Sequence, residues 1–413
     1  MKKQISPKIL MRVLGAAPNL DLRRAMQDIK VDPCGIKIML PKAESYLIKI
    51  DPLSHISANI LKQEMLSLGG DAAVARGVLT GTVKTTPCLL MGTRSQIGRL
   101  SEKLNKQPFG LGKLGSDLFE IIKNYQRDNF IIDLGKYKLN LSNRTHIMGI
   151  VNVTSDSFSG DGLLKSTVYG LRSTVCNVVA QMIDDGADII DVGGESSRPG
   201  AKPVSVKEEL KRVVPVIGEL AKKIKKPISI DTYKPEVAKG ALDNGAVLIN
   251  DISGLKNPKM SKLAAKYKAA VVIMHMPGVP RTMQKNPHYK SLIGDIISYL
   301  NKQIERAVEA GVAKEKIIID PGIGFGKTVG HNLEILNRLP EFKVLGRPIL
   351  VGPSRKSFIG KIINKEPKDR LFGTISACVS AANMGANILR VHDIAQVKEA
   401  LEVSGAIKNG YLS

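Results

Sequence analysis

The chain has 413 residues, of which 43% are hydrophobic and 24% are charged, and this composition excludes collagen-like, coiled-coil and largely disordered proteins. Lys and Arg number 61 and Asp and Glu 38, so the net charge is +23, which favours anionic partners without identifying them. There is no Trp and only 4% of the residues are aromatic. An aromatic platform for stacking nucleic-acid bases is therefore not expected, and we predict no nucleic-acid partner.

The cysteines and the hydropathy pattern bear on the compartment in which we expect the protein. No two cysteines form a C-x-x-C pair, so the sequence supports neither a zinc knuckle nor a redox dithiol. No run of about 18 apolar residues could span a membrane, and the first residues lack the uninterrupted apolar core of a signal peptide. We expect a cytoplasmic protein with reduced thiols and no membrane partner. The four cysteines are Cys34, Cys88, Cys176 and Cys378.

Residues 1–130 are predicted to form a small α/β domain without a catalytic constellation. Thr93 is in the right place to cap the second of two predicted helices. We expect a scaffold or dimerisation domain, and a regulatory or partner-binding role is the alternative. The predicted strands are 46–50 and 87–92, and the predicted helices are 56–68 and 94–105.

A hairpin is predicted next, over residues 130–141, with its turn at Gly135. Segment 131–145 would link the two domains and could close the bottom of the structure that follows.

From residue 146 onward, short runs rich in Val and Ile alternate with amphipathic, helix-length segments. Continuous apolar runs of this length fit strands that are buried on both faces of a parallel sheet. Eight strand–helix units over 146–405 predict a (β/α)₈ TIM barrel, with a doubly wound open sheet as the alternative. The predicted strands are 146–153, 187–193, 227–232, 247–252, 269–275, 317–322, 348–354 and 386–393.

Almost every predicted strand ends in a polar residue. Asp, Asn and Ser are also common in turns and helix caps, but Arg and His are not. In a barrel the carboxyl ends of all strands meet on one face, where active sites lie, so we expect a single polar pocket. The residues are Asn152, Asp191, Asp231, Asn250, Asp251, His275, Asp320, Ser354, Arg390 and His392.

Two of these carboxylates suit recognition of a planar heterocycle. Asp231 and Asp320 could each accept two parallel N–H bonds from a guanine or pterin edge. They could equally ligate a metal or form internal salt bridges, and spacing alone does not separate these possibilities.

Cations gather after the last two strands, where barrels often bind phosphate. Arg390 and Lys356 suit phosphate contacts, and Asn152 could hold a hydrated Mg²⁺ that bridges phosphate oxygens. A P-loop would require Gly at the position of Pro321, so the segment 320–328 does not match one and an NTPase is a weaker alternative.

Two Gly-rich loops follow the first two strands, at 157–162 and 193–200. Such loops can order over substrate and exclude water. Arg198, in the second loop, is a candidate contact for a second substrate.

Taken together, the motifs resemble the dihydropteroate synthase family of pterin-binding barrels, over residues 146–400. The family joins p-aminobenzoate to 6-hydroxymethyl-7,8-dihydropterin diphosphate in folate synthesis, through a dissociative mechanism that uses Mg²⁺. The matching segments are MGIVNVTSDSFSGDG (148–162), DVGGESSRPG (191–200), ISIDTYKPEV (228–237), LINDISG (248–254), MHMPGVPRTMQ (274–284), IIIDPGIGFGKT (317–328), GPSRKSFIG (352–360) and LRVHD (389–393).

The resemblance implies a role for each matching residue. Asn152, Arg390 and His392 would hold the diphosphate, with Asn152 on the metal. The pterin would be held by Asp231, Asn250, Asp320 and Lys356. The catalytic set would be Asn152, Lys356, Arg390 and His392, and the p-aminobenzoate site would be Ser197, Arg198, Pro199, Phe325 and Ser357.

The first loop departs from the family pattern. The family usually has S-D-G-G where this chain has Ser159–Gly160–Asp161–Gly162, so the acidic residue is shifted to Asp161. The expected partners are the small-molecule substrates and a second copy of the chain. The competing hypotheses are a pterin-barrel methyltransferase, which would have no use for the cations, and a non-catalytic binding protein.

Overall fold

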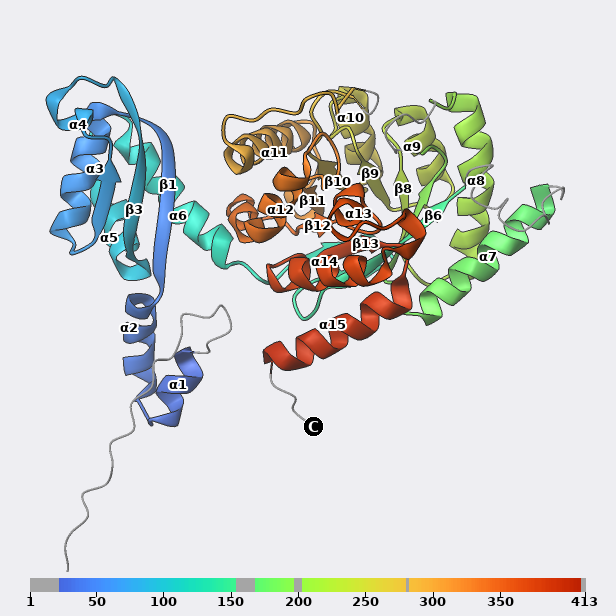
Figure 1. Ribbon diagram of the computed structural model, residues 1–413, viewed down its shortest axis with the longest axis horizontal. Helices are drawn as coiled ribbons and strands as arrows, with labels where there is room; N and C mark the ends of the chain where they lie inside the picture. Colours follow the sequence, from blue (N-terminus) through green and yellow to red (C-terminus); the bar gives the residue numbers. More distant parts are fainter. Residues whose placement is uncertain (1–21, 154–167, 197–202, 280–281, 410–413) are drawn as a thin grey trace, which may run out of the picture. The chain divides into compact units, whose positions relative to one another are not determined.

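The computed structural model describes residues 22–153, 168–196, 203–279 and 282–409. The chain divides into two compact units, Met1–Ile122 and Lys123–Ser413, and Figure 1 labels most of their helices and strands. Among the described residues no helix is long and apolar enough to cross a membrane.

The first unit is a three-stranded antiparallel sheet, in the order β1-β3-β2, packed against helices on one face. Alternate residues of β3 are buried, as expected for a sheet with one open face. The predicted α/β domain is therefore present, and Thr93 caps α5 through a reciprocal capping box with Gln96. The elements are α1 (Leu22–Asp28), α2 (Pro33–Ala43), β1 (Ser45–Ser54), α3 (His55–Ser67), β2 (Asp71–Val74), α4 (Gly77–Thr80), β3 (Thr85–Thr93), α5 (Arg94–Leu104) and α6 (Leu111–Gln126), the last of which crosses the division between the units.

The second unit contains eight parallel strands in the order β11-β10-β9-β8-β7-β6-β13-β12. A bridge between Ile319 and Ile349 joins the two ends of this order and closes the barrel. The predicted (β/α)₈ barrel is confirmed, and the open doubly wound sheet is wrong. The strands are β6 (His146–Asn152), β7 (Ile189–Gly193), β8 (Ile228–Asp231), β9 (Leu248–Asp251), β10 (Ala270–Met274), β11 (Ile317–Asp320), β12 (Leu350–Val351) and β13 (Ile388–Val391).

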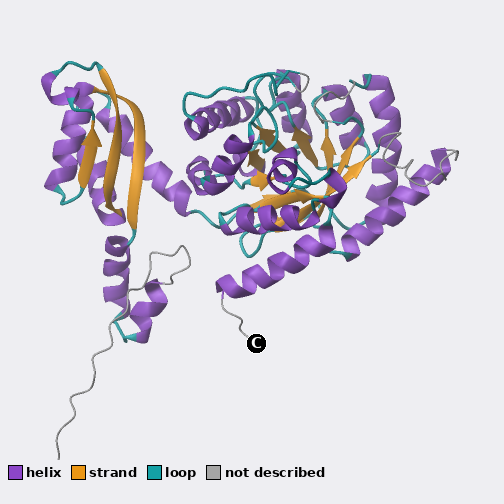
Figure 2. Cartoon of the chain, viewed as in Figure 1, coloured by secondary structure: helices purple, strands orange, loops and turns teal. Residues whose placement is uncertain are grey.

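Helices surround these strands in the second unit (Figure 2). Ser205 caps α8 by accepting a hydrogen bond from the backbone of Glu208, as its position before an apolar stripe predicts. The helices are α7 (Val168–Asp184), α8 (Val206–Lys223), α9 (Pro235–Asp243), α10 (Pro258–Tyr267), α11 (Leu292–Glu309), α12 (Val329–Asn337), α13 (Ser357–Ile363), α14 (Leu371–Asn383) and α15 (Ile394–Asn409), with 3₁₀ turns at Lys314–Lys316, Leu339–Leu345 and Pro367–Asp369.

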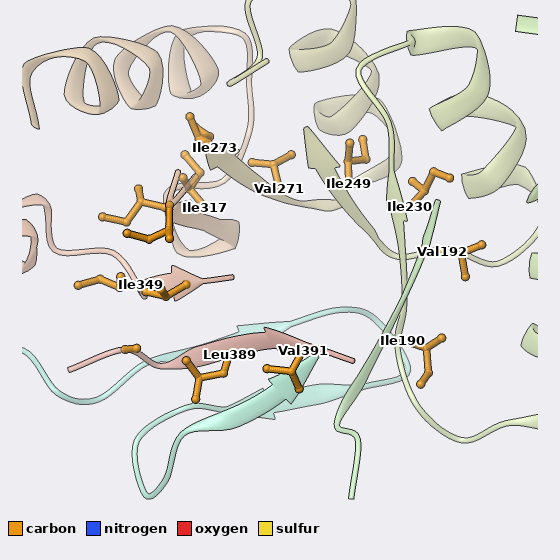
Figure 3. Close-up of a cluster of buried hydrophobic side chains, with 14 of the residues drawn as sticks. Ile190, Val192, Ile230, Ile249, Val271, Ile273, Ile317, Ile349, Leu389 and Val391 are labelled. Atoms are coloured by element: carbon orange, nitrogen blue, oxygen red, sulfur yellow. The ribbon is translucent and has the colours of Figure 1, made fainter. Parts of the chain in front are cut away.

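The strands bury apolar side chains on both faces, which explains their uninterrupted Val- and Ile-rich runs. Side chains such as Ile190 and Val192 belong to the large core formed with the helices, and Figure 3 shows both in a close-up of these buried side chains. The alternate residues, such as Met148 and Ile189, belong to a second, smaller core. Since successive side chains of a strand point to opposite faces, the second core fills the inside of the barrel.

A hairpin made of β4 (Ile131–Asp133) and β5 (Lys138–Asn140) contributes to this inner core. Its side chains Ile132 and Leu139 are buried in the same cluster as the inward-facing residues near the beginnings of the strands. The hairpin thus closes the amino-terminal end of the barrel.

A cavity of about 850 Å³ lies beside the strand beginnings, with Phe130, Arg144 and Lys343 in its wall. The active sites of barrels lie at the opposite end of the strands, and there the polar residues gather.

Candidate active site

The alternation of side chains directs one polar residue from each of several strands into the upper barrel. In β7, Ile190 and Val192 face the helices, so Asp191 between them faces inward. The same rule turns Asp320 inward, because Ile319 before it packs in the outer core. Asp231, Asn250 and Arg390 follow outward-facing residues in the same way.

Arg390 lies at the centre of this group. Its Nε donates to Oδ2 of Asp191 and its Nη2 donates to Oδ2 of Asp231, each over 2.6 Å. Asn250 Nδ2 donates to the same Asp191 oxygen over 3.0 Å. The guanidinium group therefore joins β13 to β7 and β8, and the Asp191 carboxylate adds β9 through Asn250.

One cation shared by two buried carboxylates leaves an excess of negative charge. Burial raises the pKa of Asp231 to about 7; Arg390 opposes this shift, and the Asp191 carboxylate adds to it. The pKa of Arg390 is raised despite its burial because Asp191 and Asp231 lie beside it. The other oxygen of Asp191, Oδ1, is buried without a hydrogen-bond partner among the described residues.

Asp320 ends β11, and its Oδ1 accepts a 2.6 Å hydrogen bond from the backbone of Gly322. Burial raises the pKa of Asp320 to about 6, although Gly322, Lys356, Lys327 and Arg390 all act in the opposite direction. The raised pKa values mean that the ionised carboxylates are poorly compensated by the fold, a cost that N–H groups of a ligand would offset.

The loop after Asp320 carries Phe325, whose ring is 8% exposed. The Lys356 ammonium lies 4.1 Å from the centre of that ring, at a separation typical of a cation–π contact. Gly324 has φ +82°, and a Cβ there would lie 2.9 Å from Lys356 Cδ, so only glycine allows this approach. Ser357 follows Lys356 as the first residue of α13 and is exposed.

The ends of β12 and β13 are tied together by side chains. Ser354 Oγ lies 3.0 Å from His392 Nδ1, and Arg355 pairs with Asp393 through contacts of 2.5 and 3.1 Å. Both His392 and Asn152, which ends β6, are half-buried. Arg355 is therefore held by a carboxylate, whereas His392 lies beside a hydroxyl group.

Three predicted p-aminobenzoate contacts, Ser197, Arg198 and Pro199, lie outside the described residues, as does Asp161 of the first loop. The described base of the second loop is held by Lys234, whose Nζ lies 2.5 Å from both Glu195 Oε2 and Glu209 Oε2.

Two residues of this constellation were not assigned from sequence. Asp191 is one of the polar strand ends, but nothing in its spacing reveals that it shares Arg390 with Asp231. Lys327 drew attention only through the failed P-loop comparison, yet it is buried and its Nζ lies 3.1 Å from His275 Nδ1. A lysine inside the apolar, glycine-rich run IDPGIGFGKT was the available signal.

The described residues contain no group of three or more His, Cys, Asp or Glu side chains that could hold a metal ion. Mg²⁺, however, is commonly bound through one or two protein oxygens, substrate phosphates and water. The half-buried amide of Asn152 at the end of β6 fits such a shared site.

Comparison with known proteins gives a consistent result. The family described as "Pterin binding enzyme" matches residues 148–392. Dihydropteroate synthase of Synechocystis is 45% identical over 278 residues, which are 67% of this chain and 94% of that protein. The dihydropteroate synthase structure of Xanthomonas albilineans with 4-aminobenzoic acid superposes with a TM-score of 0.64 at 40% identity, over 68% of this chain and all of that one.

A longer match includes the first unit. A probable bifunctional folylpolyglutamate synthase/dihydropteroate synthase of Halobacterium salinarum is 38% identical over 393 residues, which are 94% of this chain and 46% of that protein. The fold, the polar strand ends and these matches agree: the chain belongs to the dihydropteroate synthase family of pterin-binding enzymes.

Proposed function

We propose that this chain condenses 6-hydroxymethyl-7,8-dihydropterin diphosphate with 4-aminobenzoate, releasing 7,8-dihydropteroate and diphosphate in folate biosynthesis. The observation that carries the proposal is the cluster of Asp231, Asn250, Asp320 and Arg390 at the open end of a pterin-family barrel. The binding of 4-aminobenzoic acid by the Xanthomonas relative supports the choice of arylamine.

The pterin would be held by Asp231, Asn250, Asp320 and Lys356. A pterin ring presents adjacent N–H donors along one edge, and two carboxylates are suitable acceptors. Burial raises the pKa of Asp231 to about 7 and that of Asp320 to about 6, so both are largely ionised above pH 8. The bound N–H groups would replace the water that these carboxylates lose on burial.

The diphosphate would be held by Asn152, Arg390 and His392. Arg390 uses Nε and one Nη2 hydrogen for the two carboxylates, and three of its five N–H groups remain for phosphate oxygens. Magnesium, when bound beside Asn152, supplies positive charge that stabilises the leaving diphosphate.

The arylamine would be held by Ser197, Arg198, Pro199, Phe325 and Ser357. Phe325 offers an apolar face for the aromatic ring, and the cation of Lys356 lies against it. Exposed Ser357 at the first position of α13 is suited to a polar contact near the rim.

The reaction would proceed by a dissociative path. The C–O bond between the pterin methylene and the diphosphate breaks first, and its electron pair leaves with the diphosphate. The nitrogen lone pair of the arylamine then forms the C–N bond with the pterin carbocation, and the nitrogen releases one proton to water. Exclusion of other water from the site protects the cation until the amine attacks.

The decisive experiment measures diphosphate release from the pterin diphosphate with Mg²⁺, with and without 4-aminobenzoate. We expect release that depends on 4-aminobenzoate, with one dihydropteroate detected by mass spectrometry for each diphosphate. Pterin binding without release would contradict the proposal and would favour methyl transfer. If diphosphate release persists after exhaustive chelation of metal, the proposed role of Mg²⁺ is contradicted, but the proposed reaction is not.

We further propose that the chain is a cytoplasmic homodimer. The described cysteines Cys34, Cys88, Cys176 and Cys378 are all free thiols, which suits a reducing compartment. Phe372, on α14, is 77% exposed and Ile407, on α15, is 80% exposed, and burial of such side chains favours association. Analytical ultracentrifugation of the full chain should give twice the chain mass, and a monomer at micromolar concentration would contradict the dimer.

A further inference from the structure

Lys327 is a nearly fully buried lysine, 4% exposed, that the proposed reaction does not use. Its Nζ lies 3.1 Å from His275 Nδ1 and 3.4 Å from the His275 carbonyl oxygen, at the end of β10. The same nitrogen donates over 3.0 Å to the carbonyl oxygen of Phe325. One amine thus joins two neighbouring strand ends of the barrel.

The charge states of this pair define the direction of the hydrogen bond. Burial, together with the nearby cations Lys327 and Lys256, lowers the pKa of His275 to about 2. The imidazole is therefore neutral, and toward a protonated Lys327, which can only donate, its Nδ1 accepts while Nε2 carries the proton. Burial also lowers the pKa of Lys327 to about 7, against the attraction of Asp320.

A buried amine is expensive compared with an apolar side chain of the same length. Its three hydrogen-bond partners are all supplied by the segments that it joins, so the interaction fixes backbone position. Gly322 has φ +74°, and a Cβ there would overlap the His275 carbonyl group. The loop after β11 is therefore packed directly onto the end of β10, with Lys327 between them.

Phe325 connects this junction to the proposed arylamine site. Its carbonyl group is held by Lys327, and its ring lies against the Lys356 ammonium at 4.1 Å. Tyr289 Oη donates to the carbonyl oxygen of Gly326 over 2.8 Å and secures the next residue. Hydrogen bonds at consecutive carbonyl groups fix the backbone of this loop, and with it the point from which the Phe325 side chain projects.

We propose that Lys327 is a positioning residue for the arylamine: through the Phe325 backbone it sets the face on which the aromatic ring binds. This inference rests on the assignment of Phe325 to the arylamine site. Lys327 itself touches neither substrate, and its contacts to His275 and Phe325 carry its effect.

The test compares Lys327→Met with Lys327→Gln at pH 8. At this pH the wild-type amine is mostly neutral and keeps two N–H groups, enough for the carbonyl oxygens of Phe325 and His275, so the comparison reports hydrogen bonding more than charge. We expect Lys327→Met to raise the KM for 4-aminobenzoate tenfold or more and to change the Kd of the pterin diphosphate, measured by calorimetry, less than threefold. The shorter but donating amide of Lys327→Gln should restore part of the KM.

A matched control is Lys256→Met. Lys256 is also partly buried and donates to two backbone carbonyl groups, those of Met276 and Gly278, each over 3.1 Å. Neither of these hydrogen bonds involves Phe325, and we expect less than a twofold change in the arylamine KM. A similar rise in both lysine variants would mean a general loss of packing and would overturn the inference.

Phe325→Leu separates failure of this inference from failure of the underlying assignment. An unchanged arylamine KM in Phe325→Leu would remove Phe325 from the arylamine site. If the arylamine KM rises in Phe325→Leu but is unchanged in Lys327→Met and Lys327→Gln, Phe325 remains assigned to the arylamine site. The proposed role of Lys327 is then overturned. Equal losses of arylamine and pterin binding in Lys327→Met would also overturn it.

Discussion

At the scale of single residues, the upper barrel contains several carboxylates whose burial lowers the stability of the folded chain. Asp191 and Asp231 share the guanidinium group of Arg390, while Asp320 has a backbone N–H on one oxygen. Sites that bind ligands often retain such unfavourable groups, because the ligand completes their hydrogen bonds. Neutralising one of these carboxylates should therefore raise the free energy of unfolding and weaken ligand binding.

The first prediction concerns the stability of Asp320→Asn. Burial raises the pKa of Asp320 to about 6 from 3.8, so the folded chain binds a proton more tightly than the unfolded chain. The stability that this gives is present below pH 4 and is lost as the pH rises through 6. We expect Asp320→Asn to increase the free energy of unfolding at pH 7.5 by up to about 3 kcal/mol. At pH 4 urea titration should show no gain; an equal gain at both pH values would contradict the ionisation argument.

The second prediction concerns pterin recognition by Asp231. Replacing the carboxylate by an amide substitutes a donor for one acceptor, so Asp231→Asn should weaken binding of the pterin diphosphate by tenfold or more, about 1.4 kcal/mol. Calorimetry measures the change directly. Asp243→Asn, at the exposed end of α9, provides a control of the same chemistry, and equal affinities of the two variants would remove Asp231 from the pterin site.

At the scale of elements, the local sequence was sufficient for the strands and for the direction of their side chains. The predicted strand 227–232 contains β8, and 386–393 contains β13, because buried parallel strands need uninterrupted apolar runs. The pairing of Arg390 with Asp191 was not predictable, since the two residues are 199 positions apart. Their contact depends on closure of the barrel and the relative register of its strands, which no local pattern encodes.

The same limit applied to Lys327 and His275. Each could be identified as a polar residue near a strand end, but 52 positions separate them. The burial that makes their contact informative arises from the packing of one loop on the next strand end. Tertiary packing, rather than local propensity, therefore determined the part of the site that the sequence could not predict.

The third prediction tests the hairpin of β4 and β5. Ile132 is 1% exposed and Ile131 is 52% exposed. Two neighbouring isoleucines therefore differ in environment: Ile132 lies in the inner core and Ile131 at the surface. We expect Ile132→Ala to lower the free energy of unfolding by about 2–5 kcal/mol. Ile131→Ala should cost less than about 1 kcal/mol. Denaturant titration compares the two, and similar losses would show that the hairpin side chain does not support the barrel.

At the scale of the whole molecule, each unit has a hydrophobic core of its own. The first is built around residues such as Leu61, Leu90 and Leu100, and the second around the barrel. The Synechocystis enzyme matches 67% of the chain, whereas the Halobacterium protein matches 94%. Some relatives therefore match most of the first unit, whereas others match little of it.

The fourth prediction follows from this difference. A chain that begins at Lys123 keeps the hairpin and every described site residue, so we expect its kcat to remain within about threefold of the full chain. The assay is diphosphate release under saturating substrates, with circular dichroism to verify folding. A folded fragment that lost more than a hundredfold in kcat would assign a direct catalytic contribution to the first unit.

The hairpin that fills the lower barrel also has a consequence for the order of events in a catalytic cycle. With one end of the barrel filled by Ile132, Leu139 and their neighbours, ligands would reach the proposed sites from the opposite end, where the described strands finish. Asp231 and Asn250 lie deeper in the barrel than exposed Ser357 at its rim. An arylamine that binds first would therefore block the entry of the pterin diphosphate. We expect compulsory-order kinetics, in which the pterin diphosphate enters before the arylamine, and excess arylamine slows turnover by occupying the entrance.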